Sequence, residues 1–236
     1  KIKKIIIIGN ETYTDDELLD SFELSEGSFF SFLSSNNQYS REKLVGDIET
    51  LESYYRDRGF LKFSIESSQI SLSRDKKSIF ITYNINEGQR YTINDANVIG
   101  EIPFEEEIYI DIINSLKDQT YSQAQITGIE EFFVNVLGNR GYAFAEVSGD
   151  AEVINDTNEV KLTFSVVPGN KTYTRKILFT GNNVTQDHVL RREMRQFEGA
   201  WTSDNSIEAG KVRLERLGYF KEVNVETVPV VGTEDQ

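Results

Sequence analysis

Cysteine is absent from this sequence of 236 residues, and histidine, methionine and tryptophan each occur only once. Without cysteine, the chain forms no disulfide and offers no thiol as a nucleophile or metal ligand. The single histidine, His188, has no second imidazole with which to hold zinc, and alone it does not indicate a catalytic triad. No apolar run approaches the roughly 18 residues that a membrane-spanning helix needs. We therefore expect no enzyme activity, no metal site and no cofactor.

The chain also lacks an excess of positive charge. It carries 39 acidic and 25 basic residues, for a net charge of −14. The excess is concentrated in residues 89–170, with 14 acids and 4 bases, whereas residues 171–236 hold 10 of each. An acidic chain is a poor ligand for a phosphate backbone, so we expect no nucleic-acid partner. The acidity is typical of a soluble, mutually repelling surface.

A repeat of about 80 residues organises what the sequence does contain. Its first copy has a helical pattern in which four apolar residues share one face. These residues are Leu44, Ile48, Leu51 and Tyr55. The helix is expected to end at Gly59, because glycine adopts the left-handed conformation of a C-cap without strain. A strand follows at residues 63–72, and the same order returns after Ser122 and again around Ile207.

Each copy opens with a strand and a glycine turn, at residues 4–9, 93–100 and 176–181. A short helix, the longer helix and a hairpin complete the copy. The fold class is therefore α+β: three tandem β-α-α-β-β domains, each with two helices on one face of a small three-stranded mixed sheet. We place the domains at residues 1–88, 89–169 and 170–236. In the third, residues 222–231 form the penultimate strand and the last strand is missing, as in an excised fragment.

The helices carry three further signals. A capping box between Thr14 and Glu17 should start the short helix of the first copy. In the third copy, residues 186–197 are expected to form one amphipathic helix with Met194 and Phe197 towards the core. Each longer helix also holds a glycine, and the three lie 82 residues apart: Gly46, Gly128 and Gly210. A mid-helix glycine costs roughly 0.5–1 kcal/mol relative to alanine, so we expect close backbone packing at each.

Two stretches of the first copy are candidates for binding. In residues 63–72 the apolar side chains fall at Phe63 and Ile65 and then at Ile70 and Leu72, which changes the inward face partway. A β-bulge or a twist near residues 66–69 would accommodate this change, and bulges favour sheet edges. The apolar stretch 29–33 either caps its own core or offers a surface to a partner.

The third copy contains a dense cluster of charged and aromatic residues between positions 190 and 201. Arg191, Arg195 and Glu198 lie at i, i+4 and i+7, along one face of the expected helix. One interpretation is an intrahelical ladder of ion pairs, which stabilises the helix slightly. The other is a docking face, because arginine and tryptophan are favoured at interfaces and Trp201 follows closely. The residues alone leave both open.

Three motifs resemble the periplasmic arm of the BamA family, the outer-membrane β-barrel insertases of Gram-negative bacteria. They are RDRGF at 56–60, VLRREMRQ at 189–196 and EGAW at 198–201. The three β-α-α-β-β copies, with Gly-Asn turns after the first strand in two of them, are similar to tandem POTRA domains. The resemblance covers the whole chain and points to the third, fourth and fifth POTRA domains.

The resemblance implies a periplasmic scaffold that receives unfolded outer-membrane proteins by strand addition. It implies the sheet order first, third, second strand, with the edge-binding residues Phe63, Ile65, Glu66, Ile70 and Leu72. It also implies a docking site for the lipoprotein BamD in the third domain, formed by Arg191, Arg195, Glu198 and Trp201. BamB is a candidate partner of the first domain, and a C-terminal membrane β-barrel would complete the protein. The alternatives are the POTRA arm of a related secretion or assembly barrel and an unrelated binding or hydrolytic repeat.

Overall fold

The computed structural model describes residues 2–22, 37–154, 157–230 and 232. The apolar stretch 29–33 lies outside them. The chain divides into two compact units, one comprising residues 1–96, 112–127 and 151–162, the other residues 97–111, 128–150 and 163–236. No helix in the described part of the chain combines the length and the apolar character that a bilayer crossing requires.

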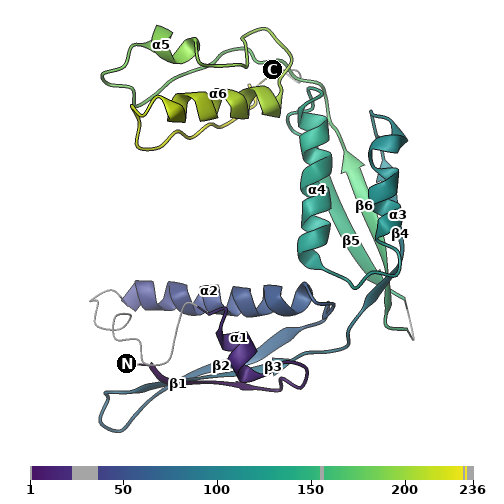
Figure 1. Ribbon diagram of the computed structural model, residues 1–236, viewed down its shortest axis with the longest axis vertical. Helices are drawn as coiled ribbons and strands as arrows, with labels where there is room; N and C mark the ends of the chain where they lie inside the picture. Colours follow the sequence, from purple (N-terminus) through teal and green to yellow (C-terminus); the bar gives the residue numbers. More distant parts are fainter. Residues whose placement is uncertain (1, 23–36, 155–156, 231, 233–236) are drawn as a thin grey trace. The chain divides into compact units, whose positions relative to one another are not determined.

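The first repeat forms the β-α-α-β-β unit that the sequence predicts (Figure 1). Its elements are β1 (Ile2–Ile8), α1 (Asp15–Leu19), α2 (Asn37–Arg56), β2 (Ser64–Leu72) and β3 (Ile79–Asn86). The strand order is β1-β3-β2, with β1 parallel and β2 antiparallel to β3. The sheet is therefore mixed, and its last strand in sequence is its central strand. The predicted capping box of Thr14 and Glu17 is present at the start of α1.

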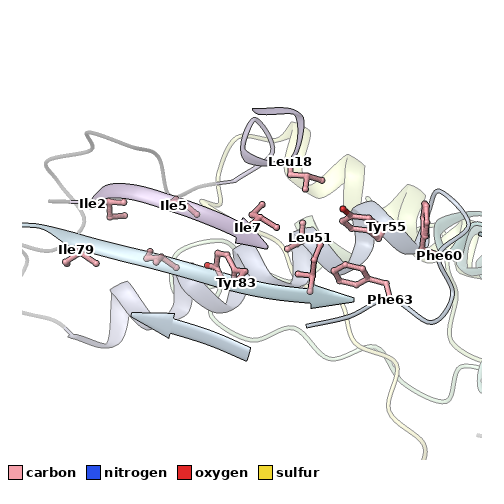
Figure 2. Close-up of a cluster of buried hydrophobic side chains, with 12 residues drawn as sticks. Ile2, Ile5, Ile7, Leu18, Leu51, Tyr55, Phe60, Phe63, Ile79 and Tyr83 are labelled. Carbon is pink, nitrogen blue, oxygen red and sulfur yellow. The ribbon is translucent and has the colours of Figure 1, made fainter. Parts of the chain in front are cut away.

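One face of this sheet carries the core of the repeat (Figure 2). Leu51 and Tyr55 of α2 are fully buried, and Leu44 and Ile48 pack against the same cluster. This confirms the helical face inferred from the spacing. Figure 2 shows Leu51 and Tyr55 beside strand side chains that alternate inward, namely Ile5 and Ile7 of β1 and Ile79 and Tyr83 of β3. Ile81 of β3 belongs to the same cluster. After α2, Gly59 takes a φ of +104°, the left-handed conformation expected there.

The second repeat has the same strand order, β4-β6-β5. Its elements are β4 (Thr92–Gly100), a 3-10 turn η1 (Glu106–Ile108), α3 (Ile110–Ser115), α4 (Gln123–Gly138), β5 (Glu146–Val153) and β6 (Glu159–Val167). Along β6 the buried side chains alternate: Val160, Leu162, Phe164 and Val166. In α4 Leu137 is buried, whereas its neighbour Val136 is only half-buried.

The third repeat contains two helices, α5 (Asp187–Arg191) and α6 (Asp204–Arg216). The predicted strands at residues 176–180 and 222–231 are wrong for the described residues, because neither segment up to residue 230 is in a strand. The two sheets give the physical reason. In each, the third strand makes the hydrogen bonds to both others. Residues 176–180 and 222–230 correspond to the two outer strands, and outer strands do not pair with each other.

The helix expected over residues 186–197 is also wrong, since α5 ends at Arg191. Met194 is buried beside Leu190 and Leu214, as predicted, but Phe197 is 65% exposed. Side-chain bonds replace the helix beyond α5. The Gln196 amide donates to the Trp201 carbonyl and accepts from the backbone N–H of Ser203. These bonds tie Gln196 to residues 201 and 203, and residues 192–197 follow turns instead of a regular helix.

Close packing explains only one of the three helical glycines. A Cβ at Gly210 would lie 3.1 Å from the sulfur and terminal carbon of Met194. Around Gly46 and Gly128, by contrast, no described atom lies within 4 Å of such a Cβ. The prediction of close backbone packing therefore holds for Gly210 and is wrong, among the described residues, for the other two. Only the α6 glycine makes room for a core side chain.

The first two repeats are joined by hydrogen bonds as well as by the chain. The backbone N–H of Tyr91 donates to the carbonyl of Gly59, 2.8 Å away. The Asp57 carboxylate, two residues before that glycine, accepts from the backbone N–H of Ala124 near the start of α4. An acceptor at the N-terminus of a helix satisfies a donor that the helix itself leaves unpaired. The first repeat thus caps a helix of the second.

The second and third repeats are joined in the same way. Thr172 N–H donates to the carbonyl of Gly141, and the Asn139 side-chain oxygen accepts from the backbone N–H of Asn205 in α6. Asn139 stands two residues before Gly141, as Asp57 does before Gly59. The short linkers are therefore reinforced by a helix cap that crosses each junction.

Candidate functional site

β2 lies at an edge of its sheet, as the resemblance implied. No strand within the described ranges pairs with its other side. The register against β3 shifts between Ile65 and Ser67, which leaves Glu66 as the extra residue of a β-bulge. This shift confirms the bulge that the odd apolar spacing predicted. An edge strand presents backbone N–H and C=O groups that a further strand can bind.

The five predicted edge residues divide into two groups. Phe63 is 3% exposed and stacks on Tyr55 with ring centroids 4.3 Å apart, and Ile65 packs against the same core. Phe63 is therefore buried in the core, and Ile65 is partly buried against it. Glu66 is exposed at the bulge, and Ile70 and Leu72 are 53% and 60% exposed. The accessible part of the edge is therefore residues 66–72.

The exposed isoleucine and leucine extend the core face of the sheet to its edge. Ile70 pairs with Ile81, and Leu72 pairs with Ile79, both buried residues of β3. Directly paired residues lie on the same face of a sheet. An extended segment that adds to β2 would gain main-chain hydrogen bonds along the strand and apolar contacts with these two side chains.

The corresponding edge strand of the second repeat has a different surface. β5 exposes three acids, Glu146, Asp150 and Glu152, whereas the single acid of β2 is Glu66. Charged side chains on an edge strand discourage strand addition. The two sheets share their topology, but of the corresponding strands β2 and β5 it is β2 that combines two exposed large apolar side chains with a single charge.

The predicted docking residues of the third repeat also divide. Arg191 and Glu198 meet, with Nη1 of the guanidinium 2.9 Å from a carboxylate oxygen. Arg191 bonds in addition to Asp187, one helical turn earlier, and to the backbone carbonyl of Ile177. Glu198 accepts from the backbone N–H of Ile177 at 2.8 Å. The pair therefore binds both backbone groups of one residue in the extended segment 176–180.

This arrangement lowers the pKa of Glu198. The hydrogen bond from the Ile177 N–H is the largest cause, and the hydrogen bond from Arg191 is the next. The ladder along one helix face that the sequence suggested is wrong in its geometry, because α5 ends at Arg191 and Glu198 lies in a later turn. The charges nevertheless pair within the repeat. About two-fifths of each side chain remains exposed, so the pair is also accessible from outside.

Arg195 and Trp201 lie on the surface of the same repeat. Arg195 is exposed and donates to the carbonyl of Met194. Trp201 is 60% exposed although its backbone forms a bridge with Tyr173, and the two rings meet edge to face. The exposed Phe197 adds a second large apolar side chain to this region of the sequence.

Sequence reasoning missed Glu87. This residue is 8% exposed, and its carboxylate accepts hydrogen bonds from four donors. They are the hydroxyls of Tyr55 and Thr12 and the backbone N–H groups of Glu11 and Thr12. A glutamate beside a glycine turn carries no pattern that distinguishes it from a solvated one. Within the described residues, no cluster of three or more acidic or histidine side chains could hold a metal ion.

Comparison with known proteins places these features in a family. Residues 1–88, 91–169 and 172–236 each match the family described as "POTRA: Surface antigen variable number repeat". Over its whole length the chain is 31% identical to the outer membrane protein assembly factor BamA of Neisseria meningitidis serogroup B, of which it covers 30%. It is 29% identical, over 95% of its length, to BamA of Buchnera aphidicola, of which it covers 36%. The chain thus spans about a third of the length of these curated relatives.

A solved structure shows the same fold. The crystal structure of POTRA domains 3–5 of Haemophilus influenzae BamA matches with a TM-score of 0.89 and 28% identity. The match covers 100% of this chain and 92% of that one. It agrees with the α+β class and with the resemblance to the third to fifth POTRA domains. The three repeats, the strand order of the first two and these matches show that the chain belongs to the POTRA family and is similar, over its full length, to part of BamA.

Proposed function

We propose that this chain is the periplasmic arm of an outer-membrane protein assembly factor and acts as a scaffold without catalytic activity. Three POTRA domains, at residues 1–88, 89–169 and 170–236, receive unfolded outer-membrane proteins and dock accessory lipoproteins. The names of the relatives support a role in outer-membrane protein assembly, and the open edge of β2 supports strand addition as the mode of client binding. That edge is the single observation that carries the proposal, because it offers backbone groups to any extended chain without requiring a particular sequence.

Placing lysines at Ile70 and Leu72 together is expected to weaken binding of an unfolded outer-membrane peptide about tenfold, which corresponds to 1.4 kcal/mol. The lysines remove two apolar contacts, and charges on an edge strand oppose the addition of another strand. The fold should be retained, because the side chains of Ile70 and Leu72 are both more than half exposed. Amide shifts of the labelled chain during peptide titration measure the effect. Ile8→Lys, at a 52% exposed position on the opposite edge strand β1, is the matched control. Shifts confined to α1 and α2 would contradict strand addition.

The third domain is the proposed docking site for the lipoprotein BamD, and the first domain is the proposed site for BamB. The BamD site consists of Arg191, Arg195, Glu198 and Trp201. The exposed Trp201 offers the kind of large aromatic contact that dominates interfaces, and Arg195 offers a charge that has only a carbonyl partner within its own repeat among the described residues. Arg191 and Glu198 hold segment 176–180 in place beside them.

Two variants separate the docking role from the structural role of this cluster. Trp201→Ala leaves the Arg191–Glu198 pair intact and is expected to lower BamD capture with no change in circular dichroism. Glu198→Lys removes the acceptor of the Ile177 N–H and sets a cation beside Arg191, so it should loosen segment 176–180 and abolish capture. Glu208→Lys, at an exposed position of α6, is the control. Equal capture by wild type and both variants in a pull-down would rule out this face.

A further inference from the structure

The edge strand of the second repeat is closed by a side chain. In β5, the backbone N–H of Gly149 donates to the Glu130 carboxylate of α4, with nitrogen and oxygen 2.5 Å apart. β5 is an outer strand, so its backbone groups point alternately towards β6 and towards the open edge. An N–H that bonds to a helix side chain is directed away from β6. The Glu130–Gly149 hydrogen bond, which we term the edge latch, therefore occupies a group that an added strand would need.

Among its described residues, the first repeat has no equivalent of this latch. The step of 82 residues that relates Gly46 to Gly128 brings Ile48 to the position of Glu130. Ile48 packs against the core of the first repeat and has no side-chain atom that can accept a hydrogen bond. The same helix position thus supports the core in one repeat and caps the sheet edge in the other. A bond to a carboxylate is stronger than one between neutral groups, so an incoming strand would exchange a strong bond for a weaker one.

The charge of β5 specifies what could bind once the latch is open. Glu146, Asp150 and Glu152 alternate along the exposed face of the strand. Opposite charges on directly paired residues stabilise strand pairing, and like charges oppose it. The strands of this sheet contain one basic residue, Lys161. The complementary occupant is an extended polypeptide whose alternate side chains are basic.

We propose that β5 is a second strand-acceptor edge, held closed by Glu130, and that the latch directs extended clients to β2. The proposal rests on strand addition at β2 as the function of the arm. Glu130→Ala removes the acceptor and opens the edge. Glu131→Ala, at the neighbouring exposed position of α4, is the matched control.

The probe is a ten-residue peptide of alternating lysine and valine, with a threonine–valine peptide as its uncharged counterpart. Each is titrated into the labelled full chain. In wild type and Glu131→Ala, amide shifts are expected in β2 only. In Glu130→Ala, the lysine–valine peptide should also bind at β5 and shift the amides of residues 148–150. Its Kd at this edge should be at least tenfold lower than that of the threonine–valine peptide. Hydrogen exchange of the Gly149 amide should be at least tenfold faster in free Glu130→Ala than in wild type.

The outcomes separate the two proposals. Binding at β2 without new binding at β5 of Glu130→Ala overturns the latch and leaves the proposed function standing. Equal binding of a peptide at β2 and at β5 of the wild-type protein overturns the latch as well. Unchanged exchange of Gly149 shows that Glu130 does not protect the amide and rejects the latch independently of any peptide. If no peptide shifts β2 in any of the proteins, strand addition itself fails and the latch fails with it.

Discussion

Alanine at Gly9 or Gly100 is expected to destabilise its repeat by about 2–5 kcal/mol, whereas alanine at Gly181 should cost only about 1–2 kcal/mol. All three glycines occupy the first turn of a repeat and have φ between +80° and +104°. A side chain is strained at each of them. The difference lies in what a Cβ would meet. At Gly9 it would lie 2.2 Å from the Ile85 carbonyl oxygen, and at Gly100 2.1 Å from that of Val166.

The larger cost arises because both carbonyls belong to the central strand and cannot move without breaking the sheet. Around Gly181, no described atom lies within 4 Å of the position that such a carbon would occupy, so only the backbone strain remains. Amide hydrogen exchange, followed separately for each repeat in the three variants, measures the loss of stability of the repeat that carries the substitution. Equal losses at the three positions would contradict the role of the central strand.

Replacing Glu87 by glutamine is expected to destabilise the first repeat by about 2–3 kcal/mol at neutral pH. The carboxylate accepts from four donors, and an amide would turn its own N–H groups towards some of them. Hydrogen exchange of the β3 amides measures the loss. Glu66→Gln, at the exposed bulge of the same repeat, is the control and should change little.

The same residue predicts a dependence on pH. Burial disfavours the charged carboxylate, but hydrogen bonds from Thr12, Tyr55 and Glu11 outweigh it and lower the pKa of Glu87. A carboxyl group with a lowered pKa stabilises the fold above its unfolded pKa of about 4.3, and this contribution is lost as the pH falls through the folded value. The difference between wild type and Glu87→Gln should therefore shrink below about pH 4. A constant difference from pH 7 to pH 3 would contradict the lowered pKa, because it would mean that folding does not change the proton affinity of Glu87.

Local signals predicted the elements of the first two repeats well. The spacing of Leu44, Ile48, Leu51 and Tyr55 identified the buried face of α2, and the odd gap after Ile65 identified the bulge of β2. Both signals depend on the period of a single element, which adjacent residues encode. The edge position of β2 depended on the family resemblance, because strand order is set by pairing between distant segments.

Long-range contacts decided the candidate sites. The pattern around Arg191 predicted a helix through residue 197, but bonds from Gln196 to Trp201 and Ser203 hold that segment in another path. The role of Glu87 could not be predicted, because its four donors come from residues at least 32 positions away. Likewise, nothing in the local sequence of Glu130 indicates that it faces Gly149.

The order of residues was sufficient to establish that the chain contains three copies of one repeat, without cysteine and with an excess of acid. It was sufficient because composition and hydrophobic period are properties of neighbouring residues. Which copies form sheets, and which edge is open, depended on tertiary contacts. A strand forms only where its partner supplies hydrogen bonds, so Gly9, Gly100 and Gly181 share a local conformation while only the first two lie against a central strand.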